Sequence, residues 1–176
     1  MGKRTNNNRI NNRQGFTLLE TIVAIAILAL AITGPLELAA RSIGFANVSK
    51  NQIVAFYLAQ EGMEYVKNIR DENFLTTGNG WLDGLDSCRA ISGCYINVPN
   101  EEIGACASDC PVLKFDASNH YYDYSPGGEK SVFIRTIKIT DVVGNIDEAK
   151  VQVTVAWTDK VGQKTFTIED NIFNWK

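Results

Sequence analysis

The chain begins with a basic stretch that is followed by a long apolar segment without charge. The first fifteen residues hold no acid and four cations, Lys3, Arg4, Arg9 and Arg13. "TIVAIAILALAI" then runs over residues 21–32 without a charge. A basic head before an apolar run is typical of a membrane-targeted N-terminus, because positive charge is retained on the cytoplasmic side. The sequence therefore predicts a membrane segment near its start.

Glu20 directly precedes this apolar segment, and a charge at that position needs a physical explanation. A charged side chain near the bilayer centre costs about 2.5 to 3.5 kcal/mol on insertion scales. A favourable interaction with a helix dipole would stabilise the carboxylate by only about 0.3 to 1 kcal/mol. That can explain why Glu20 is tolerated here, but not what its charge does. The alternative interpretation is an ordinary secretory signal cleaved after the "ALA" of residues 29–31. Glu20, and a helical pattern that continues past residue 31, both count against that alternative.

The stretch "RQGFTLLETIVAIAILALAITG" resembles the N-terminus of type IV prepilins and of the pseudopilins of type II secretion. The shared motif is a short basic leader ending in glycine, then phenylalanine, then glutamate as the fifth residue after the cut, then an apolar helix. The resemblance is strong over residues 13 to about 35 and only architectural beyond them. It implies a leader over residues 1–15 and cleavage between Gly15 and Phe16 by a membrane-embedded prepilin peptidase. It also implies methylation of the new amino group of Phe16.

The resemblance implies a role for Glu20 in assembly. In the family this carboxylate faces the freed α-amino group of Phe16, its own or that of a neighbouring subunit. A buried charge is much less costly when it is paired, so the correct axial register is favoured and wrong registers leave a charge unpaired. Gly15 would let the peptidase approach the backbone. The implied partners are other pilin subunits, the prepilin peptidase and the inner-membrane assembly platform, with residues 16–35 in the membrane.

Apolar residues continue at helical spacing beyond the membrane segment, for example Leu58, Val66 and Ile69. A helix over residues 16–69 would be about 80 Å long at about 1.5 Å per residue. Its membrane and assembly half would cover residues 16–35 and its amphipathic half residues 36–72. Gly34 and Pro35 interrupt it, and an internal proline costs about 3 kcal/mol. We expect a kink or local melting there, or else the end of the membrane span.

The middle of the chain, residues 73–130, is predicted to be loops with brief strands at "CYINV" and "VLKF". It holds all four cysteines, which suits an oxidising compartment: Cys88, Cys94, Cys106 and Cys110. Four cysteines allow three pairings, of which we favour the local one, Cys88 with Cys94 and Cys106 with Cys110. A tetrathiolate zinc site is the alternative, but the spacings lack CxxC knuckles. The common disulfide of the family lies nearer the C-terminus, so the resemblance gives no support for a receptor-binding role of these loops.

Residues 131–176 carry the strongest strand signal. "AKVQVTVAWT" alternates strictly, with Val151, Val153, Val155 and Trp157 on one face. "SVFIRTIKIT" before it and "KTFTIED" after it are also rich in β-formers, and turn residues separate the three. We therefore predict an α+β fold of the pilin type, in which the amphipathic half of the helix packs on a C-terminal antiparallel sheet.

No enzymatic, metal or cofactor motif is visible, and the only histidine is His120, which we expect at the surface. All 20 acidic residues follow the leader, which argues against direct nucleic-acid binding. "LAQEGMEYVKNIRD" followed by "VQVTVAW" resembles minor pilins or minor pseudopilins. We expect a minor pilin of a type IV pilus-like filament, with the head outside the cytoplasm. The alternatives are a minor pseudopilin of a type II secretion system and, in another class, a membrane-tethered binding module that does not polymerise.

Overall fold

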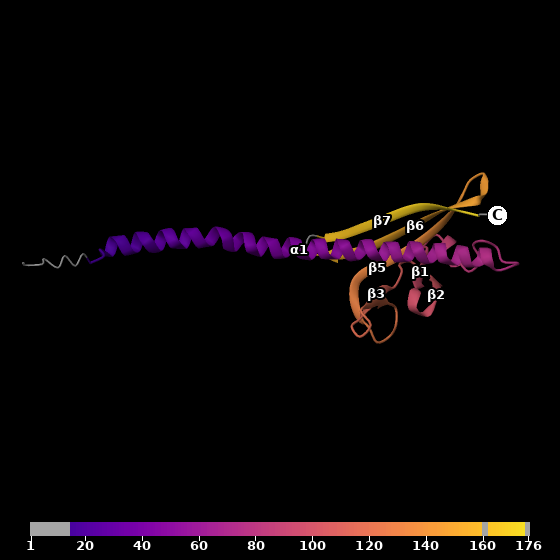
Figure 1. Cartoon of the computed structure of the whole chain (residues 1–176), viewed down its shortest axis with the longest axis horizontal. Helices are drawn as coiled ribbons and strands as arrows, with labels where there is room; N and C mark the ends of the chain where they lie inside the picture. The colour runs from indigo at the N-terminus through magenta and orange to yellow at the C-terminus, as the bar shows by residue number, and fades with distance from the viewer. Residues whose placement is uncertain (1–14, 160–161, 175–176) are drawn as a thin grey trace, which may run out of the picture. The chain divides into compact units, whose positions relative to one another are not determined.

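The computed structural model describes residues 15–159 and 162–174 of the chain. Its one α-helix in this part of the chain, α1, spans Leu18–Leu75 and precedes seven strands and two short 3-10 helices (Figure 1). The chain divides into two compact units, Met1–Ala46 and Asn47–Lys176. The first part of α1 belongs to the first unit and the rest to the second, so each unit is described separately.

In the first unit, α1 is an apolar helix with solvent-exposed side chains throughout residues 18–46. α1 is long and apolar enough to cross a membrane by length and composition. The helix continues through Gly34 and Pro35 without a break, so the local melting considered for this point does not occur. A kink at Gly34 and Pro35 stays a prediction.

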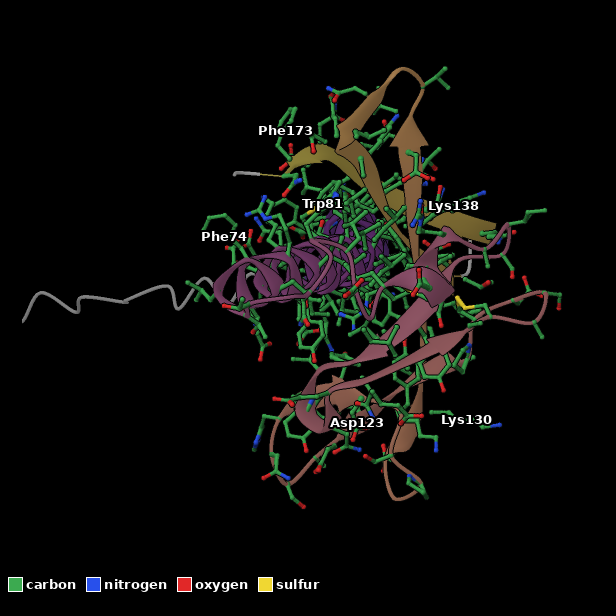
Figure 2. All side chains as sticks on the ribbon, turned by 90° about the vertical axis from the view of Figure 1, so that its right-hand side faces the viewer. Phe74, Trp81, Asp123, Lys130, Lys138 and Phe173 are labelled. Carbon is green, nitrogen blue, oxygen red and sulfur yellow. A yellow bond between two sulfur atoms is a disulfide. The ribbon has the colours of Figure 1, made fainter. Side chains whose placement is uncertain are left out.

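In the second unit, one face of α1 packs on a β-sheet. The buried apolar residues of this face recur at helical spacing: Ala55, Leu58, Ala59, Met63 and Val66. Gly62 lies among them, and a Cβ added there would be 3.2 Å from side-chain atoms of Ile137 and of Val153. The missing side chain of Gly62 therefore lets the helix approach the sheet closely. Figure 2 shows the side chains that fill the space between α1 and the sheet.

Three long strands form the predicted antiparallel meander. β5 spans Glu129–Val142, β6 spans Asn145–Asp159 and β7 spans Gly162–Phe173. β5 pairs with β6 and β6 with β7, both antiparallel. The alternation predicted for β6 is confirmed, because its helix-facing residues Val151, Val153, Val155 and Trp157 are all buried. The α+β fold, a long N-terminal helix with a C-terminal antiparallel sheet, is confirmed.

The middle of the chain contributes four short strands to the same sheet. They are β1 (Cys94–Asn97), β2 (Glu102–Ala105), β3 (Val112–Asp116) and β4 (Tyr121–Asp123), with 3-10 helices η1 (Asp86–Arg89) and η2 (Val98–Asn100). The order is β2-β1-β5-β3-β4, with β6 and β7 continuing from β5. The strands expected at "CYINV" and "VLKF" are β1 and β3. Residues 73–130 are thus less loop-like than expected, since β1 and β3 both pair with β5.

Two disulfides link residues close in sequence, Cys88 with Cys94 and Cys106 with Cys110. This is the local pairing favoured from the sequence, and it leaves no thiolate for the alternative zinc site. The first disulfide joins η1 to β1 and is fully buried, because Cys88 and Cys94 both have no exposed surface.

Arg135 of β5 is the one buried cation among the described residues, with 1% of its surface exposed. Its guanidinium donates to the carbonyl oxygens of Leu58 in α1 (3.0 Å) and Ile96 in β1 (2.7 Å), and it pairs with the Glu61 carboxylate. Burial raises the pKa of the nearby Tyr124 phenol, and the positive charge of Arg135 opposes part of that rise. Arg135 therefore joins the helix to two strands of the sheet.

Candidate processing and assembly site

Gly15, Phe16 and Thr17 precede α1 and are not helical. The Phe16 side chain is 81% exposed, and no heavy atom outside the local backbone lies within 4 Å of the position that a Cβ on Gly15 would take. Nothing in the described part of the chain therefore covers the Gly15–Phe16 bond. A peptidase that cleaves there would meet a non-helical, solvent-accessible backbone.

Thr17 caps the N-terminus of α1. Its Oγ1 accepts a hydrogen bond from the backbone N–H of Glu20 at 3.2 Å, and its carbonyl oxygen accepts from the N–H of Thr21 at 3.2 Å. Residues 17–20, "TLLE", match the S/T-x-x-E pattern of a capping box, in which a threonine oxygen satisfies one of the free N–H groups of the first turn. The Thr17 cap therefore starts the helix at Leu18, close to the Gly15–Phe16 bond.

Glu20 lies in the first turn of α1 and is exposed. Within the described residues no cation forms an ion pair with it. The positive end of the helix dipole favours an acid at this position by about 0.3 to 1 kcal/mol. Phe16 lies four residues before Glu20, in the non-helical stretch that precedes α1.

The helix surface that follows Glu20 is apolar and exposed. The large apolar side chains of residues 18–36 are all about half or more exposed, from 49% at Val23 to 79% at Leu18. The next charges are Glu37 and Arg41, which form an ion pair at 2.6 Å. The 21 residues from Phe16 to Leu36 would span about 30 Å as a helix, the thickness of a bilayer core. This length suits a membrane span that contains Glu20 near one end.

The structure brings only some of the predicted site residues together. Gly15, Phe16 and Glu20 are clustered at the start of α1, whereas Gly34 and Pro35 lie farther along the same helix. The four cysteines belong to the second unit. Sequence reasoning missed Thr17, although the S/T-x-x-E spacing to Glu20 was a sufficient signal for it.

Comparison with known proteins agrees with the motif at this site. The family described as "Prokaryotic N-terminal methylation motif" matches residues 10–34. No curated protein and no solved structure matches the chain. The matched segment contains Gly15, Phe16 and Glu20, together with the apolar surface that follows them. The chain therefore carries the N-terminal methylation motif that marks type IV prepilins and pseudopilins.

Proposed function

We propose that this protein is a structural subunit, a minor pilin, of a type IV pilus-like filament. The observation that carries the proposal is the methylation motif at residues 10–34, which coincides with an exposed apolar helix. An isolated helix with this surface is stable in lipid or against other helices but not in water. The motif points to a structural protein rather than an enzyme.

Processing precedes assembly in this proposal. Prepilin peptidase cleaves between Gly15 and Phe16 and the new amino group of Phe16 is methylated. The cations of the leader stay on the cytoplasmic side, in line with the positive-inside rule. Residues 16–35 remain in the inner membrane and the head lies outside the cytoplasm. The two disulfides fit that side, because cytosolic proteins rarely keep disulfides.

Glu20 sets the register of assembly in this proposal. Its carboxylate pairs with the amino group of Phe16, its own or a neighbouring subunit's, when helices pack against one another on the assembly platform. Helix capping does not account for the charge of Glu20, because glutamine serves equally well at the same position of a capping box. The negative charge, costly in lipid, is therefore what needs an explanation. Pairing in a filament supplies one.

The motif is shared by pilins and pseudopilins, so a minor pseudopilin of a type II secretion system is the nearest alternative. Both have the same processing and the same use of Glu20. A lone membrane tether is the alternative of another class, and it gains nothing from the charge of Glu20. The resemblance of residues 58–71 and 151–157 to minor subunits favours a minor subunit over a major one.

The N-terminal mass of membrane-extracted protein tests the processing step. In cells with prepilin peptidase we expect a chain that begins with methylated Phe16, and in cells without it the uncut chain. Gly15→Val should block cleavage and leave the fold unchanged, because the space around Gly15 is open in the structure. A chain that begins at Ile32 would instead establish the secretory signal and refute this proposal.

A further inference from the structure

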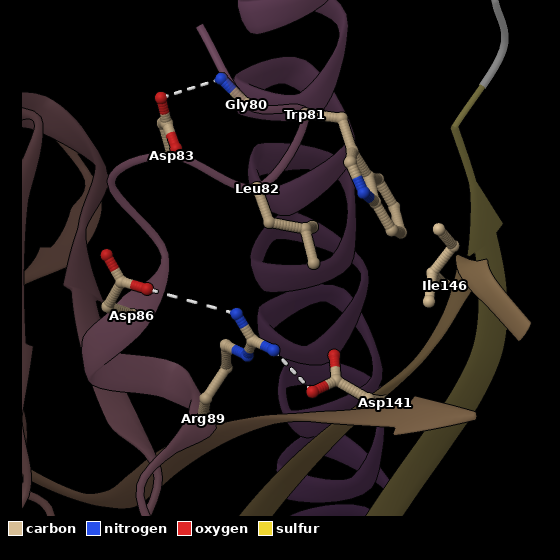
Figure 3. A pocket seen from close by; sticks show the side chains of 8 residues that line it. All are labelled: Gly80, Trp81, Leu82, Asp83, Asp86, Arg89, Asp141 and Ile146. Carbon is tan, nitrogen blue, oxygen red and sulfur yellow. Dashed lines mark hydrogen bonds and ion pairs between the residues drawn. The ribbon is translucent and has the colours of Figure 1, made fainter. Parts of the chain in front are cut away.

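Trp81 lines two grooves in the second unit. Trp81, Leu82 and Ile146 line one groove, of about 200 Å³, whereas Phe74, Trp81 and Asn174 line the other, of about 410 Å³. Phe74 is 56% exposed and Ile146 is 90% exposed. In Figure 3 the indole of Trp81 points toward Ile146 across the first groove. We call Phe74, Trp81 and Ile146, with the two grooves, the Trp81 surface.

The loop that carries Trp81 is held in place by hydrogen bonds. The side-chain amide of Asn73, a buried residue of α1, donates to the carbonyl oxygen of Asp83 at 2.8 Å. Asn79 donates to the side-chain oxygen of Asn73 at 3.1 Å, and the N–H of Gly80 donates to the Asp83 carboxylate at 2.7 Å. Next to it, η1 is anchored through the buried Cys88–Cys94 disulfide. These contacts fix the conformation of the loop that carries Trp81, and a loop that is already ordered lowers the entropic cost of binding.

The rim of the first groove is acidic. Asp83, Asp86 and Asp141 line it together with a single cation, Arg89. Arg89 forms an ion pair with Asp141 and lies 4.0 Å from Asp86 (Figure 3). Asp86 and Asp141 are both well exposed, with side-chain exposures of 84% and 59%. The groove therefore combines the half-buried Trp81 and the exposed Ile146 with an excess of negative charge.

We propose that the Trp81 surface binds a protein partner that presents an apolar side chain flanked by lysine or arginine. The apolar side chain would pack on the half-buried Trp81 and the exposed Ile146, because tryptophan is enriched among the residues that contribute most to the binding energy of interfaces. The flanking cations would lie on Asp83, Asp86 and Asp141, where complementary charge steers association. The three carboxylates exclude phosphate-rich partners such as nucleic acids. They also exclude a second copy bound through the same surface, since like charges would face each other.

The test uses the full chain in neutral detergent, labelled with fluorotryptophan and followed by fluorine NMR. The probe is a short peptide of alternating lysine and leucine. The chain has three tryptophans, so Trp175 is replaced by phenylalanine in every sample to leave two signals. We expect the signal of Trp81 to shift and saturate, while that of Trp157, which is buried, stays in place as an internal reference. Peptides of alternating glutamate and leucine, or lysine and serine, should bind at least tenfold more weakly. The readout needs neither processing nor assembly, so its failure is distinct from failure of the proposed function.

Two variants locate the binding. Trp81→Ala, read on backbone amide signals of the same loop, should abolish the response, and Asp86→Asn combined with Asp141→Asn should weaken it at least fivefold. Glu129→Gln, which removes an exposed acid at the start of β5, is the matched control and should bind as the wild type does. An unshifted Trp157 signal shows that each aspartate variant is folded. The proposal is refuted by no response to the lysine–leucine peptide, by equal binding of the glutamate–leucine or lysine–serine peptide, or by undiminished binding in the variants.

Discussion

Arg135 is a residue through which β5 contacts both α1 and β1. It lies in phase with Phe133, Ile137 and Ile139 of β5, on the buried face of the strand. Its guanidinium donates to the carbonyl oxygens of Leu58 and Ile96, which are 77 and 39 residues away in sequence. The Glu61 carboxylate supplies the counter-charge.

The Glu61–Arg135 pair should respond unequally to loss of either partner. The Glu61 side chain is 37% exposed and can be hydrated, whereas Arg135 is almost fully buried. Glu61→Leu leaves a buried guanidinium without a counter-charge, which typically costs about 3 to 5 kcal/mol of unfolding free energy. Arg135→Met leaves a hydrated carboxylate and two carbonyl oxygens, so we expect a smaller loss. Thermal unfolding of the detergent-solubilised chain measures both.

Glu64→Leu is the control for Glu61→Leu, because Glu64 lies on the same helix and its side chain is 73% exposed. We expect it to change the unfolding free energy by less than about 1 kcal/mol. A loss for Glu64→Leu as large as that for Glu61→Leu would show that the buried pair does not stabilise the head.

At the scale of elements, periodicity predicted the long strands and the helix well. The meander β5–β6–β7 follows from alternation over many residues, and α1 ends at Leu75, a few residues beyond the predicted amphipathic half. β1 and β2 both have four residues, but only β1 was predicted, because β2 holds Glu, Gly and Ala, which are depleted in strands. β4 has three residues, too few for a reliable period, and was also missed. The pairing of β1 and β3 with β5 and the acceptors of Arg135 depend on non-local contacts and could not be predicted. Glu20 and Gly15 could be, because the motif that contains them is local. Pro35 lies within the continuous α1, so the proline signal for melting was outweighed by the surrounding helix formers.

The missing side chain of Gly62 allows α1 to pack closely on the sheet. Gly62→Leu should lower the unfolding free energy by about 1 to 3 kcal/mol, because the side chain would overlap Ile137, Val153 and Arg135 in a packed core. Gly44→Leu is the matched control on the same helix, where a Cβ meets nothing within 4 Å. Thermal unfolding monitored by circular dichroism compares the two. If both variants unfold at the same temperature, the close contact of Gly62 does not limit packing.

The whole molecule combines two units with different surfaces. Met1–Ala46 holds the processing motif and an apolar helix surface, whereas Asn47–Lys176 buries its own core of helix and sheet. The acid at Glu20 is the feature of the first unit that a membrane anchor alone does not need. We therefore propose that the charge of Glu20 serves assembly.

Glu20→Gln tests this claim most directly. Glutamine keeps the capping geometry and removes only the charge, so we expect normal membrane content and a normal processed mass. Incorporation into sheared filaments should fall more than tenfold, because an unpaired buried amino group costs about 2 to 5 kcal/mol and each 1.4 kcal/mol is about tenfold. Glu37→Gln, at an exposed acid on the same helix, should incorporate normally. Normal incorporation of Glu20→Gln would contradict the account and favour a lone tether, and loss of its processing would assign Glu20 to recognition by the peptidase.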